Sequence, residues 1–130
     1  MPLSNGQEII VVDNNSTDRT AEIASEFNAR LVFESVNQIS RARNTGAKAA
    51  NGKYLVFLDA DTMLNRALLR TALNNLKGGQ ICGGGAAVQM ERKVDGLTQS
   101  VLDFWNWYSR KRNIAAGCFI YCLQEAFVAI

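Results

Sequence analysis

The segment 52–62 constrains this chain more than any other part of the sequence. Residues 54–58 form a short apolar block of Tyr, Leu, Val, Phe and Leu, and two carboxylates, Asp59 and Asp61, follow almost at once. A block of this length and composition predicts a strand that is buried on both faces, as in parallel sheets, with Leu58 in the core. Two neighbouring carboxylates at its end are costly unless positive charge lies close to them.

Two explanations of this acid pair are open. A divalent cation that carries a phosphorylated ligand would suit it, because hard cations take oxygen ligands and share phosphate oxygens. Alternatively, both acids are solvated and precede a helix whose first turn favours negative charge. For an isolated Asp-x-Asp the solvated pair is the favoured explanation, because short motifs often arise by chance, so the flanking sequence has to decide.

Apolar periodicity predicts alternating strands and helices in the first part of the chain. The expected strands cover residues 8–12, 31–33 and 54–58, and the expected helices cover residues 20–27, 41–51 and 64–76. This alternation predicts an α/β fold with a parallel sheet and right-handed crossovers. Ligands of such sheets bind beyond the carboxyl ends of the strands. Asp13 and Asp59 each follow a strand directly, so we expect both to face one crevice.

The second half of the chain is less regular. We expect strands at residues 86–90 and 117–123, while the glycines at 83–85 lack the spacing of a dinucleotide-binding fingerprint. An apolar stripe with helical spacing lies between them, made of Leu97, Val101, Phe104, Trp105 and Tyr108, and a basic run follows at residues 110–112. Core packing is the favoured interpretation of this stripe, and a surface that rests on a lipid or glycan acceptor is the alternative.

Composition limits the chemistry that this chain can perform. Its 130 residues suffice for one domain, which we take to cover residues 1–130. Because the chain has no histidine, any general base must be a carboxylate, and Ser-His or Cys-His nucleophiles are excluded. The net charge is +2 and no long basic run is present, so no nucleic-acid partner is predicted.

Cysteine usage and hydropathy bear on location. Cys82, Cys118 and Cys122 lie in apolar surroundings, which predicts reduced core cysteines in the cytoplasm. The polar start of the chain lacks the apolar core of a signal peptide, and residues 114–130 are too short and too polar to span a membrane. The expected location is the cytoplasm, including the cytoplasmic face of the membrane.

Two segments together resemble a known family. EIIVVDNNSTDRTAEIA at residues 8–24 and SRARNTGAKAANGKYLVFLDADT at residues 40–62 are similar to the nucleotide-sugar-binding half of family 2 glycosyltransferases. The resemblance covers about residues 8–69, with a weaker similarity at residues 116–130. It implies a Rossmann-like parallel sheet of the GT-A type and a nucleotide-sugar donor linked to UDP or GDP.

The resemblance also implies roles for residues that bind the nucleotide. Asp13 stands where the family holds the nucleotide base, and Asn14 replaces a second acid that the family often has. Arg43 and Asn44 belong to a motif that lines the nucleotide pocket. Either Arg43 or Arg41 would offer planar donors to the base or the phosphates. From the residues alone, a solvated helix start is the favoured explanation of these arginines.

The acid pair takes two further roles by resemblance. Asp59 is expected to meet the ribose, and Asp61 to hold the Mg²⁺ or Mn²⁺ that bridges the diphosphate. The metal would assist departure of the nucleoside diphosphate as a Lewis acid. The sugar would pass with inversion to a hydroxyl of a glycan or lipid-linked acceptor.

The chain departs from the family pattern at both ends. The family opens with a further apolar strand and continues past the position of Ile130 to a later acid, so we expect a partial GT-A domain without the usual first strand. We therefore assign no catalytic base. In a doubly wound sheet the absent strand would lie between strands 8–12 and 54–58. Those strands should then pair directly, accept another strand, or leave unpaired edges that favour self-association.

Two other functions are compatible with the sequence. A nucleotidyltransferase also uses acids on a doubly wound sheet, but a glycine-rich basic loop should then follow its first strand, and residues 13–18 are not such a loop. A binding or interaction module that keeps the fold without turnover is the second alternative.

Overall fold

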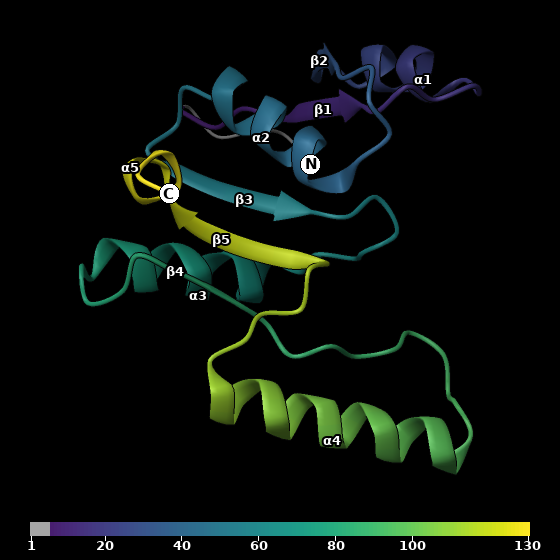
Figure 1. Cartoon of the computed structure of the whole chain (residues 1–130), viewed down its shortest axis with the longest axis vertical. Coiled ribbons are helices and arrows are strands. Elements are labelled where there is room, and N and C mark those ends of the chain that lie inside the picture. Colours follow the sequence, from purple (N-terminus) through teal and green to yellow (C-terminus); the bar gives the residue numbers. More distant parts are fainter. Residues whose placement is uncertain (1–5) are drawn as a thin grey trace.

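The computed structural model describes residues 6–130 and confirms an α/β fold (Figure 1). Its elements in chain order are β1 (Ile10–Asp13), α1 (Thr20–Glu26), β2 (Arg30–Phe33), α2 (Ile39–Ala49), β3 (Tyr54–Leu58), α3 (Arg66–Lys77), β4 (Gly83–Gly85), α4 (Gly96–Arg112), β5 (Phe119–Leu123) and α5 (Gln124–Val128). The six elements predicted for the first part of the chain are all present, with bounds that shift by at most two residues at either end. The short helix α5 was not predicted.

The strands form two separate groups. β1 and β2 pair in parallel, with Ile10 opposite Arg30 and Asp13 opposite Phe33, as predicted for strands joined by a crossover helix. β3 differs from the prediction, because its partner is β5, which runs antiparallel to it. β5 is central in the second sheet and pairs on its other side with β4, also antiparallel.

β1 and β3 each keep one edge without a strand partner among the described residues. Next to β3, the Asp59 N–H donates to the Cys118 carbonyl, and the Gln124 N–H donates to the Lys53 carbonyl. The backbone N–H and C=O groups of the odd-numbered residues of β3 therefore face β5. Backbone groups of the even-numbered residues 54, 56 and 58 therefore face the other edge. Direct pairing of β1 with β3, one of the three expected outcomes, does not occur, and self-association through these edges stays a prediction.

No strand forms at residues 6–9 beside β3, while residues 1–5 lie outside the described part of the chain. Figure 1 shows β1 and β3 running in the same direction, with their carboxyl ends toward the same side of the molecule. α2 packs on β1 and β2. Its Gly46 lies so close to Val12 that an added Cβ would be 2.9 Å from the valine Cγ2, so only glycine fits this approach.

The main core lies between α3 and the β3–β5–β4 sheet. Its buried members are Ala72 and Leu76 of α3 with Phe119 and Tyr121 of β5. Among the residues of β3, Leu55 is 6% exposed, but Leu58 is 42% exposed. The prediction that Leu58 belongs to the core is therefore wrong, because the strand ends at the sheet margin.

The glycines at 83–85 form β4, whereas residues 86–90, predicted as a strand, are irregular. Gly84 lies beneath the Tyr121 ring, and a Cβ at this position would be 2.7 Å from the phenol oxygen. Because Gly84 has no side chain, β4 can pair with β5 beside the Tyr121 ring. Cys82 is exposed rather than in the core, and all three cysteines are free thiols. Burial and the nearby Cys82 raise the pKa of the Cys122 thiol.

α4 contradicts the core interpretation of the aromatic stripe. Leu97, Val101 and Phe104 are 77%, 60% and 62% exposed, while the polar Ser109 is 8% exposed. The Asn106 side chain accepts from the Val88 N–H at 2.9 Å and donates to the Val88 carbonyl at 2.8 Å. α4 is thus attached to the body through its polar side, and its apolar side faces outward.

Candidate functional site

Asp13 and Asp59 lie at the carboxyl ends of strands, as predicted. Asp13 is 8% exposed, and its Oδ1 accepts a hydrogen bond of 2.9 Å from the Ser16 N–H in the turn that follows. Asn15 in the same turn has a φ of 59°, a left-handed conformation that asparagine tolerates. The backbone of this turn therefore fixes the position of the Asp13 carboxylate.

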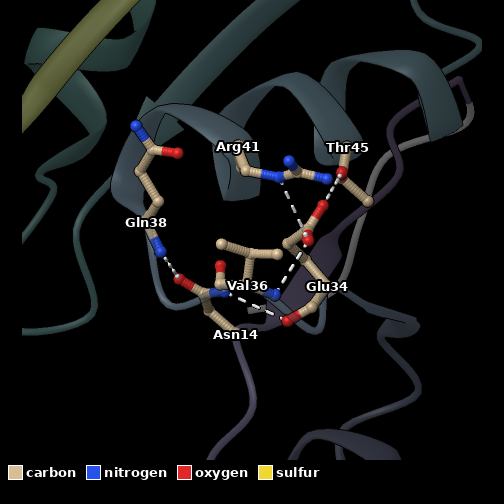
Figure 2. Close-up of polar contacts among 6 residues, drawn as sticks. All are labelled: Asn14, Glu34, Val36, Gln38, Arg41 and Thr45. Carbon is tan, nitrogen blue, oxygen red and sulfur yellow. Dashed lines mark hydrogen bonds and ion pairs between the residues drawn. The ribbon is translucent and has the colours of Figure 1, made fainter.

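A third acid at a strand end, Glu34, was not predicted as a site residue. It follows β2 directly, and its N–H donates to the Asp13 carbonyl at 2.9 Å. Its Oε2 accepts from the Thr45 hydroxyl at 2.8 Å, and its Oε1 accepts from the Val36 N–H at 3.0 Å (Figure 2). The signal was available in the sequence, since Glu34 follows a predicted strand just as Asp13 and Asp59 do.

The environment of Glu34 favours its ionised form. The hydrogen bond from the Val36 N–H, then that from the Thr45 hydroxyl, lowers the pKa of the carboxyl, and the charge of Arg41 acts in the same direction. The Arg41 Nε lies 3.4 Å from the Glu34 carboxylate (Figure 2). Arg41 is therefore paired with Glu34.

Asn14 uses its amide to hold the loop between β2 and α2. Its Nδ2 donates to the carbonyls of Glu34 and Val36, at 3.0 and 2.6 Å, and its Oδ1 accepts from the Gln38 N–H at 3.1 Å (Figure 2). Both N–H donors of the amide are thus occupied within the chain. This geometry favours a role for Asn14 in positioning the loop that leads into α2.

Arg43 joins α2 to the ends of β3 and β5. Its Nη2 donates to the Asp59 Oδ1 at 2.9 Å and to the Gly117 carbonyl at 2.7 Å. The N–H groups of its Nε and Nη1 have no hydrogen-bond partner within residues 6–130 and stay available to a ligand. Asn44, the next residue of α2, is exposed, and its side chain makes no hydrogen bond to any described residue.

Asp61 is exposed at the end of the β3 loop. Its only hydrogen bond within the described residues is a long one of 3.4 Å from the Thr62 hydroxyl. No group of three or more His, Cys, Asp or Glu side chains within residues 6–130 is placed to hold a metal ion. A single exposed carboxylate could hold a Mg²⁺-type cation only together with ligand phosphates and waters.

Contacts connect these residues into one continuous region. Asp13 contacts Glu34, Glu34 contacts α2 through Arg41 and Thr45, and α2 contacts Asp59 through Arg43. Asp61 follows Asp59 by two residues, while the Asn44 side chain makes no hydrogen bond to this region. The arrangement thus combines acids and arginines at the carboxyl ends of strands, where α/β proteins bind their ligands.

The chain is thus an α/β domain with a polar site at its strand ends. The sequence model of the glycosyl transferase family 2 matches residues 4–125, and the chain belongs to that family.

Curated relatives agree with this membership. The chain is 31% identical to glycosyltransferase AglE of Haloferax volcanii over 129 residues, which cover 91% of this chain and 42% of AglE. It is 33% identical to the uncharacterized glycosyltransferase EpsJ of Bacillus subtilis over 57% of this chain and 23% of EpsJ. It is 32% identical to the poly(ribitol-phosphate) beta-N-acetylglucosaminyltransferase TarS of Staphylococcus aureus over 50% of this chain and 12% of TarS.

The chain spans less than half the length of each of these relatives. No solved structure gives a significant match to it. Within the part of the chain that the structure describes, no helix is long and apolar enough to cross a membrane.

Proposed function

We propose that this domain binds a nucleoside-diphosphate sugar at the carboxyl ends of β1 and β3, for transfer of the sugar to an acceptor hydroxyl. The observation that carries the proposal is the Arg43–Asp59 ion pair of 2.9 Å beside the exposed Asp61, in a chain of this family. The pair fixes one edge of Arg43 and leaves its Nε and Nη1 donors for a phosphate. Asp13 and Asp59 would meet the base and the ribose of a UDP- or GDP-linked donor.

In the proposed reaction, an acceptor oxygen forms a bond to the anomeric carbon as the bond to the diphosphate breaks, with inversion. The nucleoside diphosphate leaves with the electron pair, and the hydroxyl proton passes to a carboxylate base to which we assign no residue. A Mg²⁺ or Mn²⁺ held by Asp61 and the diphosphate would supply Lewis-acid neutralisation of the leaving group. The acceptor would be a glycan or a lipid-linked sugar. The domain would act in the cytoplasm, where reducing conditions keep cysteines such as these three as free thiols.

Calorimetric titration with nucleotides tests this function. We expect UDP or GDP to bind more tightly with Mn²⁺ than without it, and Asp61→Asn to remove at least about tenfold of that gain, because an amide is a poorer ligand for a hard cation. Asp103→Asn on α4 is the matched control, because within residues 6–130 its carboxylate accepts a side-chain hydrogen bond only from Gln99 of the same helix. An Asp61→Asn domain that binds as tightly as the parent in Mn²⁺ would contradict the metal role.

The same titration separates the alternatives. Preference for a nucleoside triphosphate would indicate a nucleotidyltransferase. No nucleotide affinity in either condition would leave a binding or interaction module. Circular dichroism of Asp61→Asn should match that of the parent, since this exposed side chain contributes nothing to the core.

A further inference from the structure

The outward side of α4 is a continuous apolar surface on a helix that the body of the domain does not cover. We call it the aromatic face, and it consists of Leu97, Val101, Phe104, Trp105 and Tyr108, all at least 36% exposed. At about 100° per residue these positions fall on one side of the helix. Figure 1 shows α4 at the end of the molecule opposite β1 and β2, apart from the two sheets.

The borders of the aromatic face are suited to a water–lipid boundary. Trp105 and Trp107 flank the face on its two sides, and Trp107 is 53% exposed. Phe104 lies 5.9 Å from Trp107 and 6.1 Å from Tyr108, measured between ring centroids. Tryptophan and tyrosine rings gather at membrane interfaces because they join an apolar body to a polar tip.

Lys111 and Arg112 stand at the carboxyl end of the same face, whereas the Arg110 Nε donates to the Asn106 carbonyl at 3.0 Å on the inward side. The three consecutive residues 110–112 are Arg, Lys and Arg, and none of them forms an ion pair within the described residues. The Lys111 Nζ lies 5.1 Å from the centroid of the Trp107 ring. Asp103, the only acid within α4, lies about 160° around the helix from Val101 and from Trp105.

From this combination we propose that the aromatic face of α4 docks on an anionic lipid bilayer, with the helix lying in the plane of the interface. The aromatic and aliphatic side chains of the face supply the apolar contact, and Lys111 and Arg112 meet anionic headgroups. A second copy of this face fits less well, because it carries no carboxylate to meet the cations of the first. Docking through α4 does not depend on donor binding, and it would hold the domain at a membrane surface.

Both tryptophans of the chain are on α4, so tryptophan fluorescence, excited selectively over tyrosine, reports on this helix alone. We expect a blue shift when the 130-residue chain meets vesicles of equal parts phosphatidylcholine and phosphatidylglycerol, and little shift with phosphatidylcholine alone. Brominated acyl chains should quench the emission. Raising the salt concentration should release the protein, because exposed charges are screened.

Two variants with matched controls make the test specific. Phe104→Ala should weaken co-sedimentation with the anionic vesicles about tenfold or more, while Phe27→Ala, which removes a 78% exposed ring outside α4, should not. Lys111→Gln with Arg112→Gln should also weaken it about tenfold, and Arg66→Gln with Arg70→Gln on α3 should have less effect. Donor titration of each variant should match the parent.

Three results would overturn the proposal. Sedimentation with vesicles but no blue shift would place the contact elsewhere on the domain. Equal binding to neutral and anionic vesicles would remove the role of Lys111 and Arg112. A blue shift that appears without lipid and grows with protein concentration would make a second copy of the chain the occupant of the face.

Discussion

α3 and α4 are both amphipathic helices, but they are attached to the domain by opposite sides. α3 buries its apolar side, with Ala72 and Leu76 at 1% and 3% exposure against the β3–β5–β4 sheet. α4 turns its polar side inward, through Asn106 and Ser109, and leaves Phe104 62% exposed. The comparison shows that an apolar stripe defines a helix and its faces, whereas the surroundings decide which face is covered.

The largest difference between the two helices should appear in stability. Leu76→Ala on α3 should lower the free energy of unfolding by about 2–5 kcal/mol, because it leaves a cavity in the core. Phe104→Ala on α4 should change it by no more than about 0.5 kcal/mol, because the ring has few partners to lose. Urea denaturation of both variants measures this. An equal cost at Phe104 would mean that the aromatic face is covered in solution.

A smaller effect should separate the polar contacts of the two helices. Asn106→Leu on α4 removes both hydrogen bonds to Val88 and leaves a partly buried N–H and C=O unpaired, which should cost about 1–3 kcal/mol. Asn74→Leu on α3 is the control. Its side chain makes no hydrogen bond within the described residues, so it should shift stability by about 0.5 kcal/mol or less.

Hydrogen exchange locates the effect of Asn106→Leu. Faster exchange along α4, with α3 unchanged, would show that the helix loosens from residues 86–90. A more stable Asn106→Leu protein would instead mean that α4 gains by turning an apolar side chain inward, and the observed attachment would be wrong.

Local patterns were sufficient to predict most elements of the fold. Residues 54–58 were predicted as a strand with the bounds the structure gives, and the helices begin and end near the predicted residues because periodicity and capping are local properties. The direction of β5 relative to β3 could not be predicted from the residues of β5, because a short apolar strand has the same sequence pattern in a parallel and in an antiparallel sheet. The exposure of Leu58 depends on where the neighbouring strand ends, which no local pattern contains.

The candidate site was predicted in part for the same reason. Asp13, Asp59 and Asp61 follow strands, so their position at strand ends could be derived from the sequence. The Arg43–Asp59 pair joins residues 16 apart, and the bonds from Asn14 to the β2–α2 loop join residues at least 20 apart, so both depend on the packing of α2. Glu34 carried the same strand-end signal as Asp13 but was not predicted as a site residue.

The smallest predicted difference concerns how the two helices begin. Asn65 caps α3 with its Oδ1, which accepts from the Leu68 N–H at 2.8 Å. Asp95 caps α4 with a carboxylate that accepts from the N–H groups of Leu97 and Thr98, both at 3.0 Å, and from the Thr98 hydroxyl. Only the second cap can be titrated.

The Thr98 hydroxyl, followed by the Thr98 N–H, lowers the pKa of the Asp95 carboxyl below its ordinary value of 3.8. Because the folded pKa is the lower one, the cap stabilises α4 fully above pH 3.8 and loses this effect as the pH falls through the folded pKa. Amide exchange or chemical shifts measured during acidification should therefore show the first turn of α4 loosening, at Leu97 and Thr98, while Leu68 of α3 keeps its protection. Asp95→Asn should abolish this dependence and still cap the helix. If Leu97 and Leu68 lost protection together at every pH, the first turn of α4 would open only with the whole domain, and the two helices would not differ in this respect.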